Sequence, residues 1–301
     1  MRRPRRGTSG RPGTIRAAAL VVVAMVIAGC QPSSYQYRWD YFVDSIIRPD
    51  SLILQGVMLT LVISVVAKVL GVVLGVLGAL GKMAKSPLFR IPAVIYVWIF
   101  RGTPLLVQIM LVFYGLGVTR LYTWPDITPL GIFGKGAVQA GIVALGVNEG
   151  AYMSEIVRAG ILSIDPGQME AAKSLGMTFA QAMRRIILPQ AARVIVPPLG
   201  NEFNNMLKTT SLLVVISVPE LYVTFSNKNA SGPTVFHPFE LFLAAAVWYL
   251  LLTTIWGFFQ AEIERRLGRG AAGESGPSLR ERLFGLRARK PEELPSVTGG
   301  R

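Results

Sequence analysis

Five long stretches of this chain carry almost no charge, and each is long enough to cross a lipid bilayer as a helix. They cover residues 52–80, 91–117, 137–157, 194–218 and 239–260. About 20 apolar residues in a helix span the hydrocarbon core of a membrane. Only 16% of the residues are charged, whereas a soluble domain carries roughly 25%. The sequence therefore predicts an all-α integral membrane protein with a core of five helices.

The basic residues between these stretches predict how the chain is oriented. Seventeen Lys and Arg residues fall in one set of connecting segments and five in the opposite set. Because loops rich in Lys and Arg stay in the cytoplasm, the first set, which includes the C-terminal segment, is expected there. The net charge of +14 comes from basic residues that lie where membrane topology requires them. It therefore does not indicate binding to nucleic acid, and no nucleic-acid partner is expected. One cysteine and one histidine are too few ligands for a zinc site, and no cofactor is expected.

Residues 1–30 are interpreted as a leader, residues 31–267 as the membrane domain, and residues 268–301 as a basic tail. The leader has a basic start and a short apolar run that ends at Cys30, which is typical of a secretory signal. Residues 27–30, Ile-Ala-Gly-Cys, also resemble a bacterial lipobox, so Cys30 is a candidate for lipidation; an uncleaved anchor helix is the alternative. The tail is expected to be disordered or to contact anionic lipid headgroups.

Two features inside the apolar stretches predict how their helices pack. Small residues recur at every fourth position of the first stretch, at Ala67, Gly71, Gly75 and Ala79, and such a ridge lets a second helix approach closely. Lys68 lies beside this ridge. We interpret it as snorkelling or as pairing with a carboxylate on a neighbouring helix, and a charge that lines a path is the alternative. In the second stretch, Gly102 and Pro104 predict a kink or break in the helix. Two interpretations are open: the break borders a cavity, or it is a purely structural kink.

The segment 158–193, between the third and fourth stretches, predicts two short helices joined by a tight turn. The signals are an N-cap with a capping box, a left-handed turn residue, a second capping box and a terminating proline: Asp165 with Gln168, Gly176, Thr178 with Gln181, and Pro189. Each pairing follows the known preferences of helix ends. Both ends of the segment are tied to apolar stretches, so it is expected on the cytoplasmic face of the membrane.

This segment resembles the EAA loop of bacterial ABC importer permeases. The matching pattern is Glu170-Ala171-Ala172, three residues, Gly176, nine residues, Ile186, one residue, and Leu188-Pro189. Three flanking segments resemble the polar amino acid branch of the histidine and glutamine type: residues 100–108, residues 150–155, and residues 198–212. The resemblance covers about residues 40–266.

The resemblance implies a five-helix importer permease in the bacterial cytoplasmic membrane that does not itself hydrolyse ATP. The implied partners are an ABC ATPase subunit, a second permease copy as homodimer or heterodimer, an extracytoplasmic solute-binding protein and membrane lipids. It also implies that the loop docks on the ATPase through the residues Asp165, Glu170, Ala171, Ala172, Gly176, Ile186, Leu188 and Pro189. No phosphate-binding loop of the type Gly-x-x-x-x-Gly-Lys-Ser/Thr occurs in the sequence, so ATP is expected to bind another chain.

Polar residues in the third and fourth stretches are candidates for the substrate path. Asn201, Asn204, Asn205 and Lys208 share one helical face, which is expected to face the bundle interior or a water-filled cavity. Asn148 and Glu149 lie at a comparable depth in the third stretch. Glu149 and Lys208 together offer an acceptor and a donor for an amino acid; a buried ion pair between them is the alternative.

Two other functions compete with an importer permease. An ion-coupled carrier or channel would work without an ATPase, and it would show internal repeats that we do not find. A membrane-anchored adaptor would agree with the lipobox and the basic tail but would leave the polar helical face unexplained.

Overall fold

The structure is a computed structural model that describes residues 35–231 and 236–268. The chain divides into two compact units, Met1–Arg38 and Trp39–Arg301. Cys30 and the rest of the leader lie outside the described residues, as does the tail after residue 268. All the helices named below lie in the second unit.

The regular elements of this unit are all helical within the described residues. The α-helices are α2 (Trp39–Ile47), α3 (Ser51–Met83), α4 (Pro87–Gly102), α5 (Leu105–Met110), α6 (Leu116–Val118), α7 (Gly136–Leu162), α8 (Pro166–Ser174), α9 (Phe179–Ala182), α10 (Leu188–Thr209), α11 (Leu221–Ala230) and α12 (Pro238–Gly268). Two π-helices, η1 (Leu111–Gly115) and η3 (Met183–Ile187), and two 3₁₀-helices, η2 (Thr128–Gly134) and η4 (Thr210–Ile216), connect them. The helical fold class predicted from the sequence is confirmed.

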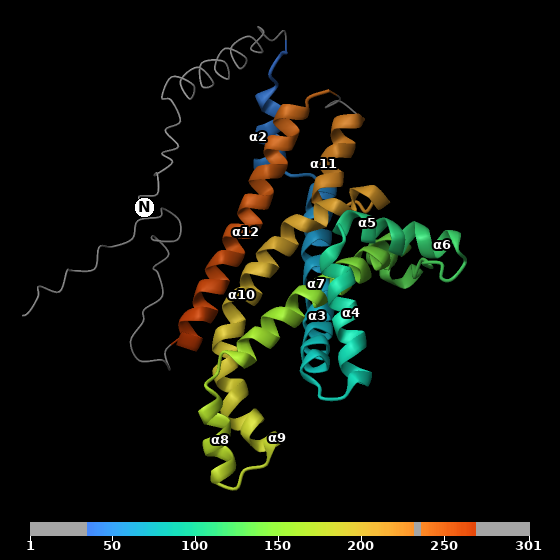
Figure 1. Ribbon diagram of the computed structural model, residues 1–301. Helices are drawn as coiled ribbons and strands as arrows, with labels where there is room; N and C mark the ends of the chain where they lie inside the picture. The colour runs from blue at the N-terminus through green and yellow to red at the C-terminus, as the bar shows by residue number, and fades with distance from the viewer. Residues whose placement is uncertain (1–34, 232–235, 269–301) are drawn as a thin grey trace, which may run out of the picture. The chain divides into compact units, whose positions relative to one another are not determined.

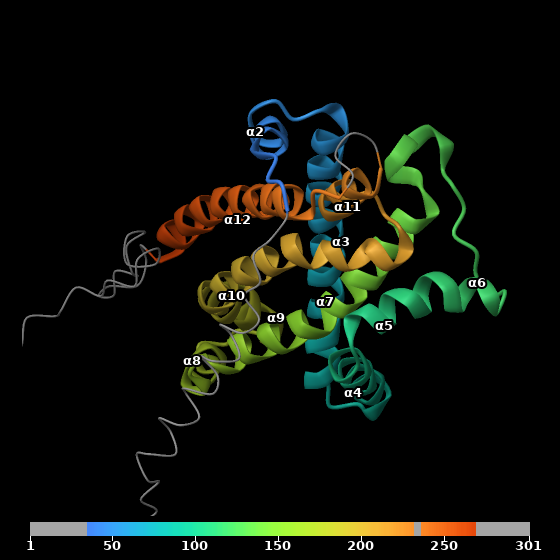
Figure 2. The same ribbon diagram turned by 90° about the horizontal axis from the view of Figure 1, so that it is seen from above.

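The predicted stretches correspond to two straight helices and three bent ones. By length and composition, α3 and α12 are each long and apolar enough to cross a membrane. Three further helix pairs meet the same test together, with bends of 109°, 53° and 47° at short breaks, which gives up to five spans among the described residues. The sharpest bend separates α4 from α5, at the predicted break between Gly102 and Pro104. Both views show the segment from α5 to α6 running away from the end of α4 (Figure 1 and Figure 2).

The ridge of small residues packs closely against a second helix, as the sequence predicts, and the structure shows that this helix is α7. Gly71 and Gly75 are buried, and a side chain at either position would overlap α7. A Cβ on Gly71 would lie 2.6 Å from Glu149 Cγ, and a Cβ on Gly75 would lie 2.3 Å from Met153 Cβ. The helices α3 and α7 are therefore held at close backbone distance, which is how helices associate in lipid.

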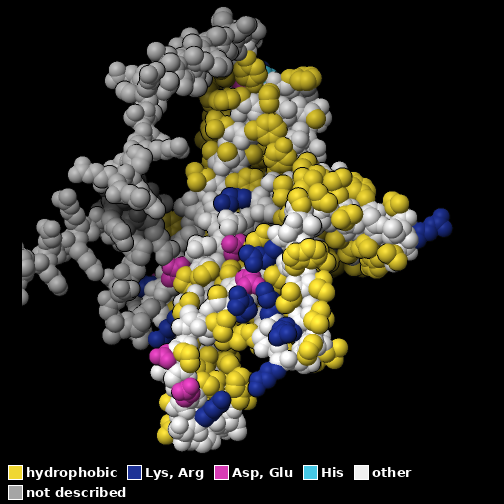
Figure 3. Space-filling view, in the orientation of Figure 1, with side chains coloured by type: hydrophobic (Ala, Val, Ile, Leu, Met, Phe, Trp, Pro, Cys, Tyr) yellow, Lys and Arg dark blue, Asp and Glu magenta, His cyan; other side chains and the backbone are white. Residues whose placement is uncertain are grey.

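The turn between α3 and α4 lies toward the same end of this unit as α8 and α9, opposite α2 (Figure 1). The segments at this end carry most of the basic residues between the spans: Lys82, Lys85, Arg90, Arg158, Lys173, Arg184, Arg185 and Arg193. On the face shown in Figure 3, dark blue Lys and Arg side chains gather in this half. The arrangement agrees with the loop assignment made from the charge distribution.

Candidate functional site

The loop between α7 and α10 folds into the two short helices that the sequence predicts. Gly176 ends α8 in the left-handed conformation, with φ of +76°, where a side chain is disfavoured. Thr178 and Gln181 form the expected capping box at α9. At α8, Asp165 is the N-cap as predicted, but its carboxylate accepts the N–H of Gly167 at 2.7 Å. The capping box expected between Asp165 and Gln168 was therefore wrong, because the Gln168 N–H bonds to the Asp165 backbone carbonyl instead.

The residues of the EAA pattern divide into an exposed set and a buried set. Glu170, Ala171 and Gly176 are exposed, whereas Ala172 is 1% exposed. The Ala172 methyl group is thus covered by its own chain and is not free to contact a partner. Ile186 is partly buried against the cluster that joins the loop to α7 and α10.

Pro189 does not end the second loop helix, contrary to the prediction. The helix continues through η3 into α10 and reaches Thr209. Pro189 has no N–H to donate, and the π-helix that ends two residues before it, at Ile187, relaxes the usual hydrogen-bond pattern of the helix. The loop is therefore joined to the middle of the membrane domain by one continuous helical segment.

Two apolar side chains on this loop were not singled out from the sequence. Leu175 is 81% exposed and Phe179 is 61% exposed, and they flank the turn at Gly176. Leu188, from the EAA pattern, is 43% exposed. Exposed apolar groups of this size indicate a contact surface when they cluster. Single-sequence patterns do not separate such residues from core residues, because both are apolar.

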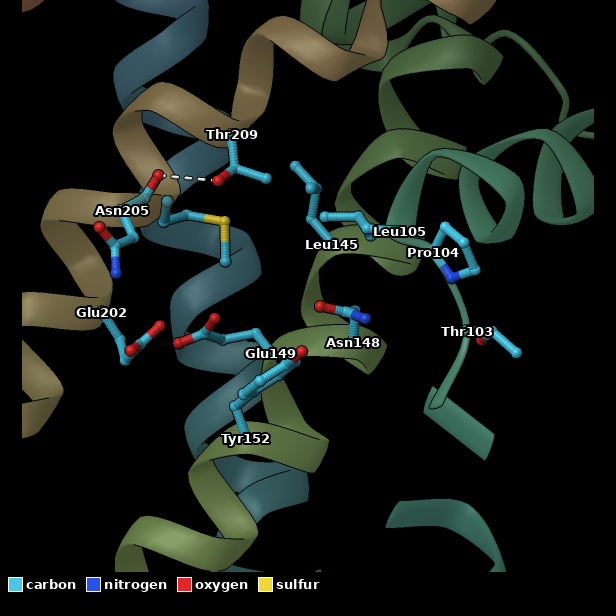
Figure 4. Close-up of a pocket in the computed structure, with 11 residues that line it drawn as sticks. Thr103, Pro104, Leu105, Leu145, Asn148, Glu149, Tyr152, Glu202, Asn205 and Thr209 are labelled. Atoms are coloured by element: carbon cyan, nitrogen blue, oxygen red, sulfur yellow. Dashed lines mark hydrogen bonds between the residues drawn. The ribbon is translucent and has the colours of Figure 1, made fainter. Parts of the chain in front are cut away.

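A pocket of about 420 Å³ lies where the break after α4 meets α7 and α10. Its lining comprises Thr103, Pro104, Leu105, Leu145, Asn148, Glu149, Tyr152, Glu202, Asn205, Met206 and Thr209. Figure 4 shows the carboxylates of Glu149, from α7, and Glu202, from α10, pointing toward one another across this pocket. A pocket with two carboxylates, amides and hydroxyls among apolar walls suits a small polar ligand that carries an ammonium group.

The pocket contains only part of the predicted path. Glu149 and Asn205 line it, whereas Asn201 and Lys208 do not. Asn201, Asn205 and Lys208 are all exposed on the surface of the isolated chain. The bundle of a single chain therefore does not cover this face of α10. Glu202 was missed, because it is offset from the Asn201–Asn205–Lys208 stripe on the helix.

The alternative ion pair between Glu149 and Lys208 is wrong. Glu149 pairs with Lys68 of α3, and both side chains are buried. This pair confirms the interpretation of Lys68 as the partner of a carboxylate on a neighbouring helix. Close packing at Gly71 brings Glu149 over α3, whereas Lys208 points out of the described bundle.

The wall of the pocket at the α4–α5 break is held by two buried amides. Gln108 Nε2 donates to the Phe100 carbonyl at 2.9 Å and to the Thr103 carbonyl at 3.1 Å. Asn148 Nδ2 donates to the same Phe100 carbonyl at 3.0 Å and to Gln108 Oε1 at 2.9 Å. The end of a helix leaves carbonyls without intrahelical partners, and these two amides supply donors for them. They fix Thr103 at the edge of the pocket.

Comparison with known proteins identifies the kind of protein to which this geometry belongs. Residues 71–269 match the family described as binding-protein-dependent transport system inner membrane component. The chain belongs to this family. As a transport permease subunit, it has the arrangement expected for such a protein: apolar helices around a polar pocket, and a helical loop at one end.

The relatives of this permease include several amino acid transporters. It is 38% identical over 268 residues to the arginine transport system permease protein ArgU of Corynebacterium glutamicum, covering 86% of this chain and 82% of that protein. It is 37% identical over 216 residues to the nopaline transport system permease protein NocQ of Agrobacterium fabrum, covering 69% of this chain and 88% of that protein.

Solved structures agree with this assignment. An amino acid ABC transporter crystallised with histidines has a chain that is 36% identical, with a TM-score of 0.66, covering 77% of this chain and 100% of that chain. The MetNI methionine ABC transporter has a chain that is 20% identical, with a TM-score of 0.57, covering 72% of this chain and 96% of that chain. The second likeness supports the fold alone.

Proposed function

We propose that this permease subunit forms the path of an ATP-driven importer of amino acids, and that its pocket between α5, α7 and α10 binds the substrate. The observation that carries the proposal is the pair of carboxylates, Glu149 and Glu202, in a pocket among apolar helices. Ionisable groups inside membrane segments are costly and mark substrate pathways.

The pocket offers the groups that a zwitterionic amino acid needs. A carboxylate accepts hydrogen bonds from the substrate ammonium group. The Asn205 amide and the Tyr152 hydroxyl are available as donors for the substrate carboxylate. The Thr209 hydroxyl already donates to the Asn205 backbone carbonyl at 2.8 Å. Several relatives are named as amino acid permeases, which supports the same substrate class for this chain.

The exposed face of α10 supports a second permease copy beside this pocket. Asn201, Asn205 and Lys208 are exposed in the isolated chain, and a polar face of this kind is unfavourable against lipid tails. A second copy that meets this face would keep the three residues in a water-filled path. We propose that Asn201 and Lys208 line this continuation of the path outside the pocket.

The loop Asp165–Pro189 is proposed to receive the movement of a separate ATPase. Glu170, Ala171 and Leu175 offer an exposed charged and apolar surface for docking. Because η3 and α10 continue from this loop to Glu202 and Asn205, a displacement of the loop is transmitted along one helix to the pocket.

ATP-dependent uptake in proteoliposomes tests this proposal. The permease is reconstituted with its ATPase and solute-binding protein and offered a panel of labelled amino acids. We expect ATP-dependent uptake of at least one of them, and Glu170→Arg should abolish it by reversing a charge on the docking surface. Glu262→Arg is the control charge reversal, because Glu262 belongs to α12 and is part of neither the loop nor the pocket lining.

Two outcomes would contradict this proposal. Uptake that needs no ATP would favour an ion-coupled carrier. Normal ATPase capture together with full uptake in Glu170→Arg would contradict the role of the loop.

A further inference from the structure

A buried ion pair joins the two helices that pack most closely around the pocket. The Lys68 ammonium group of α3 donates to Glu149 Oε1 of α7, and Lys68 Nζ also lies 3.6 Å from Met153 Sδ. Lys68 is 8% exposed and Glu149 is 6% exposed. The ion pair is therefore shielded from water, and each charge depends on the other for compensation.

The two carboxylates of the pocket differ in their partners. Glu149 has the Lys68 cation, whereas no Lys or Arg pairs with Glu202 within residues 35–231 and 236–268. Glu202 lies close enough to act electrostatically on both Lys68 and Glu149. With Glu149 neutralised by Lys68, the three groups leave one negative charge without a partner, at Glu202.

We propose that Lys68 determines the charge specificity of the pocket: it neutralises Glu149 and leaves Glu202 as the single free carboxylate for a cationic substrate. The proposal rests on the proposed function and extends it to a substrate class, amino acids with a positively charged side chain. Lys68 is not itself part of the pocket lining, so it acts on specificity through Glu149.

The alternative is an ion pair that only holds α3 against α7. Both roles predict that the loss of one partner harms the protein, because an uncompensated charge stays buried. They differ in what happens to the preference between a cationic and a neutral substrate. A structural pair changes the uptake of both substrates by the same factor.

The decisive measurement is the ratio of kcat/KM for arginine over glutamine, measured by ATP-dependent uptake with the reconstituted complex. Glu202→Gln removes the free carboxylate, so this ratio should fall at least tenfold, about the loss of one charged hydrogen bond. The double variant Lys68→Met with Glu202→Gln frees Glu149 in its place. In that variant, the ratio should return to within about threefold of the unmodified protein.

Two further variants separate specificity from assembly. In Glu149→Gln, Glu202 is the carboxylate that remains for Lys68 to neutralise. No free carboxylate is then left for the substrate, so the ratio should also fall. Lys68→Met with Glu149→Gln leaves Glu202 as one free carboxylate and should recover the ratio. Complex yield after detergent extraction is measured for every variant, so that a loss of assembly is recognised. Lys82→Met is the matched control, because Lys82 pairs with Glu155 and also joins α3 to α7, away from the pocket.

The proposal is overturned if Lys68→Met with Glu202→Gln keeps the low ratio of Glu202→Gln while assembling normally. It is also overturned if Glu149→Gln lowers the uptake of both substrates equally, or if the unmodified complex does not prefer arginine. Failure of the proposed function is recognised separately, since the unmodified complex would then take up no amino acid at all.

Discussion

Glu220 sits at the junction of α3, α11 and α12, and it provides a quantitative test of how this bundle is held together. It is 0% exposed. Its Oε2 accepts hydrogen bonds from the Tyr249 hydroxyl at 2.7 Å and the Thr60 hydroxyl at 3.3 Å, and its Oε1 accepts the Val223 N–H at 3.0 Å. Thr60 in turn accepts the Leu221 N–H at 3.1 Å. The shortest of the bonds to the carboxylate comes from Tyr249.

Tyr249→Phe deletes that donor and leaves the ring in place. A hydrogen bond to a charged group contributes about 1.5–3 kcal/mol. For a domain of this size, a change of 1 kcal/mol moves the unfolding midpoint by about 2–4 °C. We therefore expect the midpoint of the detergent-purified protein to fall by about 3–12 °C, measured as loss of the monodisperse peak after heating.

Tyr114→Phe is the matched control for this variant. The Tyr114 hydroxyl donates to the Val215 carbonyl at 3.1 Å, at an exposed position with a neutral acceptor. The acceptor carries no charge, so the loss of this bond should cost about 0.5–1.5 kcal/mol, less than the loss of the bond to the Glu220 carboxylate. Equal midpoint shifts in the two variants would refute the argument that the buried Glu220 carboxylate makes the Tyr249 bond the stronger one.

Four other variants test three separate regions. Gly176→Val forces a β-branched side chain into a left-handed turn and should abolish uptake. The charge reversal Glu170→Arg should also abolish uptake, and both variants should still insert into the membrane. Full uptake by Gly176→Val would contradict this prediction. Partial burial opposes ionisation of Asp50, but its bonds to Lys228 and the Ile53 N–H outweigh burial and hold its pKa below the usual value. The Asp50–Lys228 ion pair therefore contributes stability above about pH 4 and loses it as pH falls through the lowered pKa. Asp50→Asn should destabilise the protein by less than about 1 kcal/mol at pH 7, and this difference from the unmodified protein should shrink as the pH is lowered below about 4. If Cys30 is lipidated, the intact mass should include a diacylglyceryl group that Cys30→Ser lacks, and Cys30→Ser should block signal cleavage. An unmodified Cys30 still joined to residues 1–29 would leave only the anchor-helix interpretation.

The sequence predicted local geometry well wherever a single residue type controls it. Gly176 is left-handed because its place after α8 requires a positive φ. The break at Gly102–Pro104 forms because proline cannot donate its backbone bond. The 109° angle of that break could not be predicted in the same way. It depends on Gln108, which reaches back from α5 to the Phe100 carbonyl of α4, and on Asn148 of α7, which donates to the same carbonyl.

Helix ends were harder to predict where two elements merge. The sequence predicts that Pro189 ends a helix, but η3 runs directly into α10, which contains Pro189 in its first turn. A proline predicts the loss of one hydrogen bond, and a π turn beside it makes that loss tolerable. The sequence does not mark the π turn, because residues 183–187 are Met-Arg-Arg-Ile-Ile, an ordinary helical composition.

Charge pairing is the part of the site that helical periodicity could not predict. The spacing of Asn201, Asn205 and Lys208 correctly places them on one face of α10, but periodicity orders residues within one helix and says nothing of its neighbours. Glu149 is separated from Lys68 by 81 positions, and the two meet because Gly71 lets α7 approach α3. The small-residue ridge therefore carried more information about the site than the polar stripe did. It determined which cation reaches Glu149, and so which carboxylate of the pocket stays free.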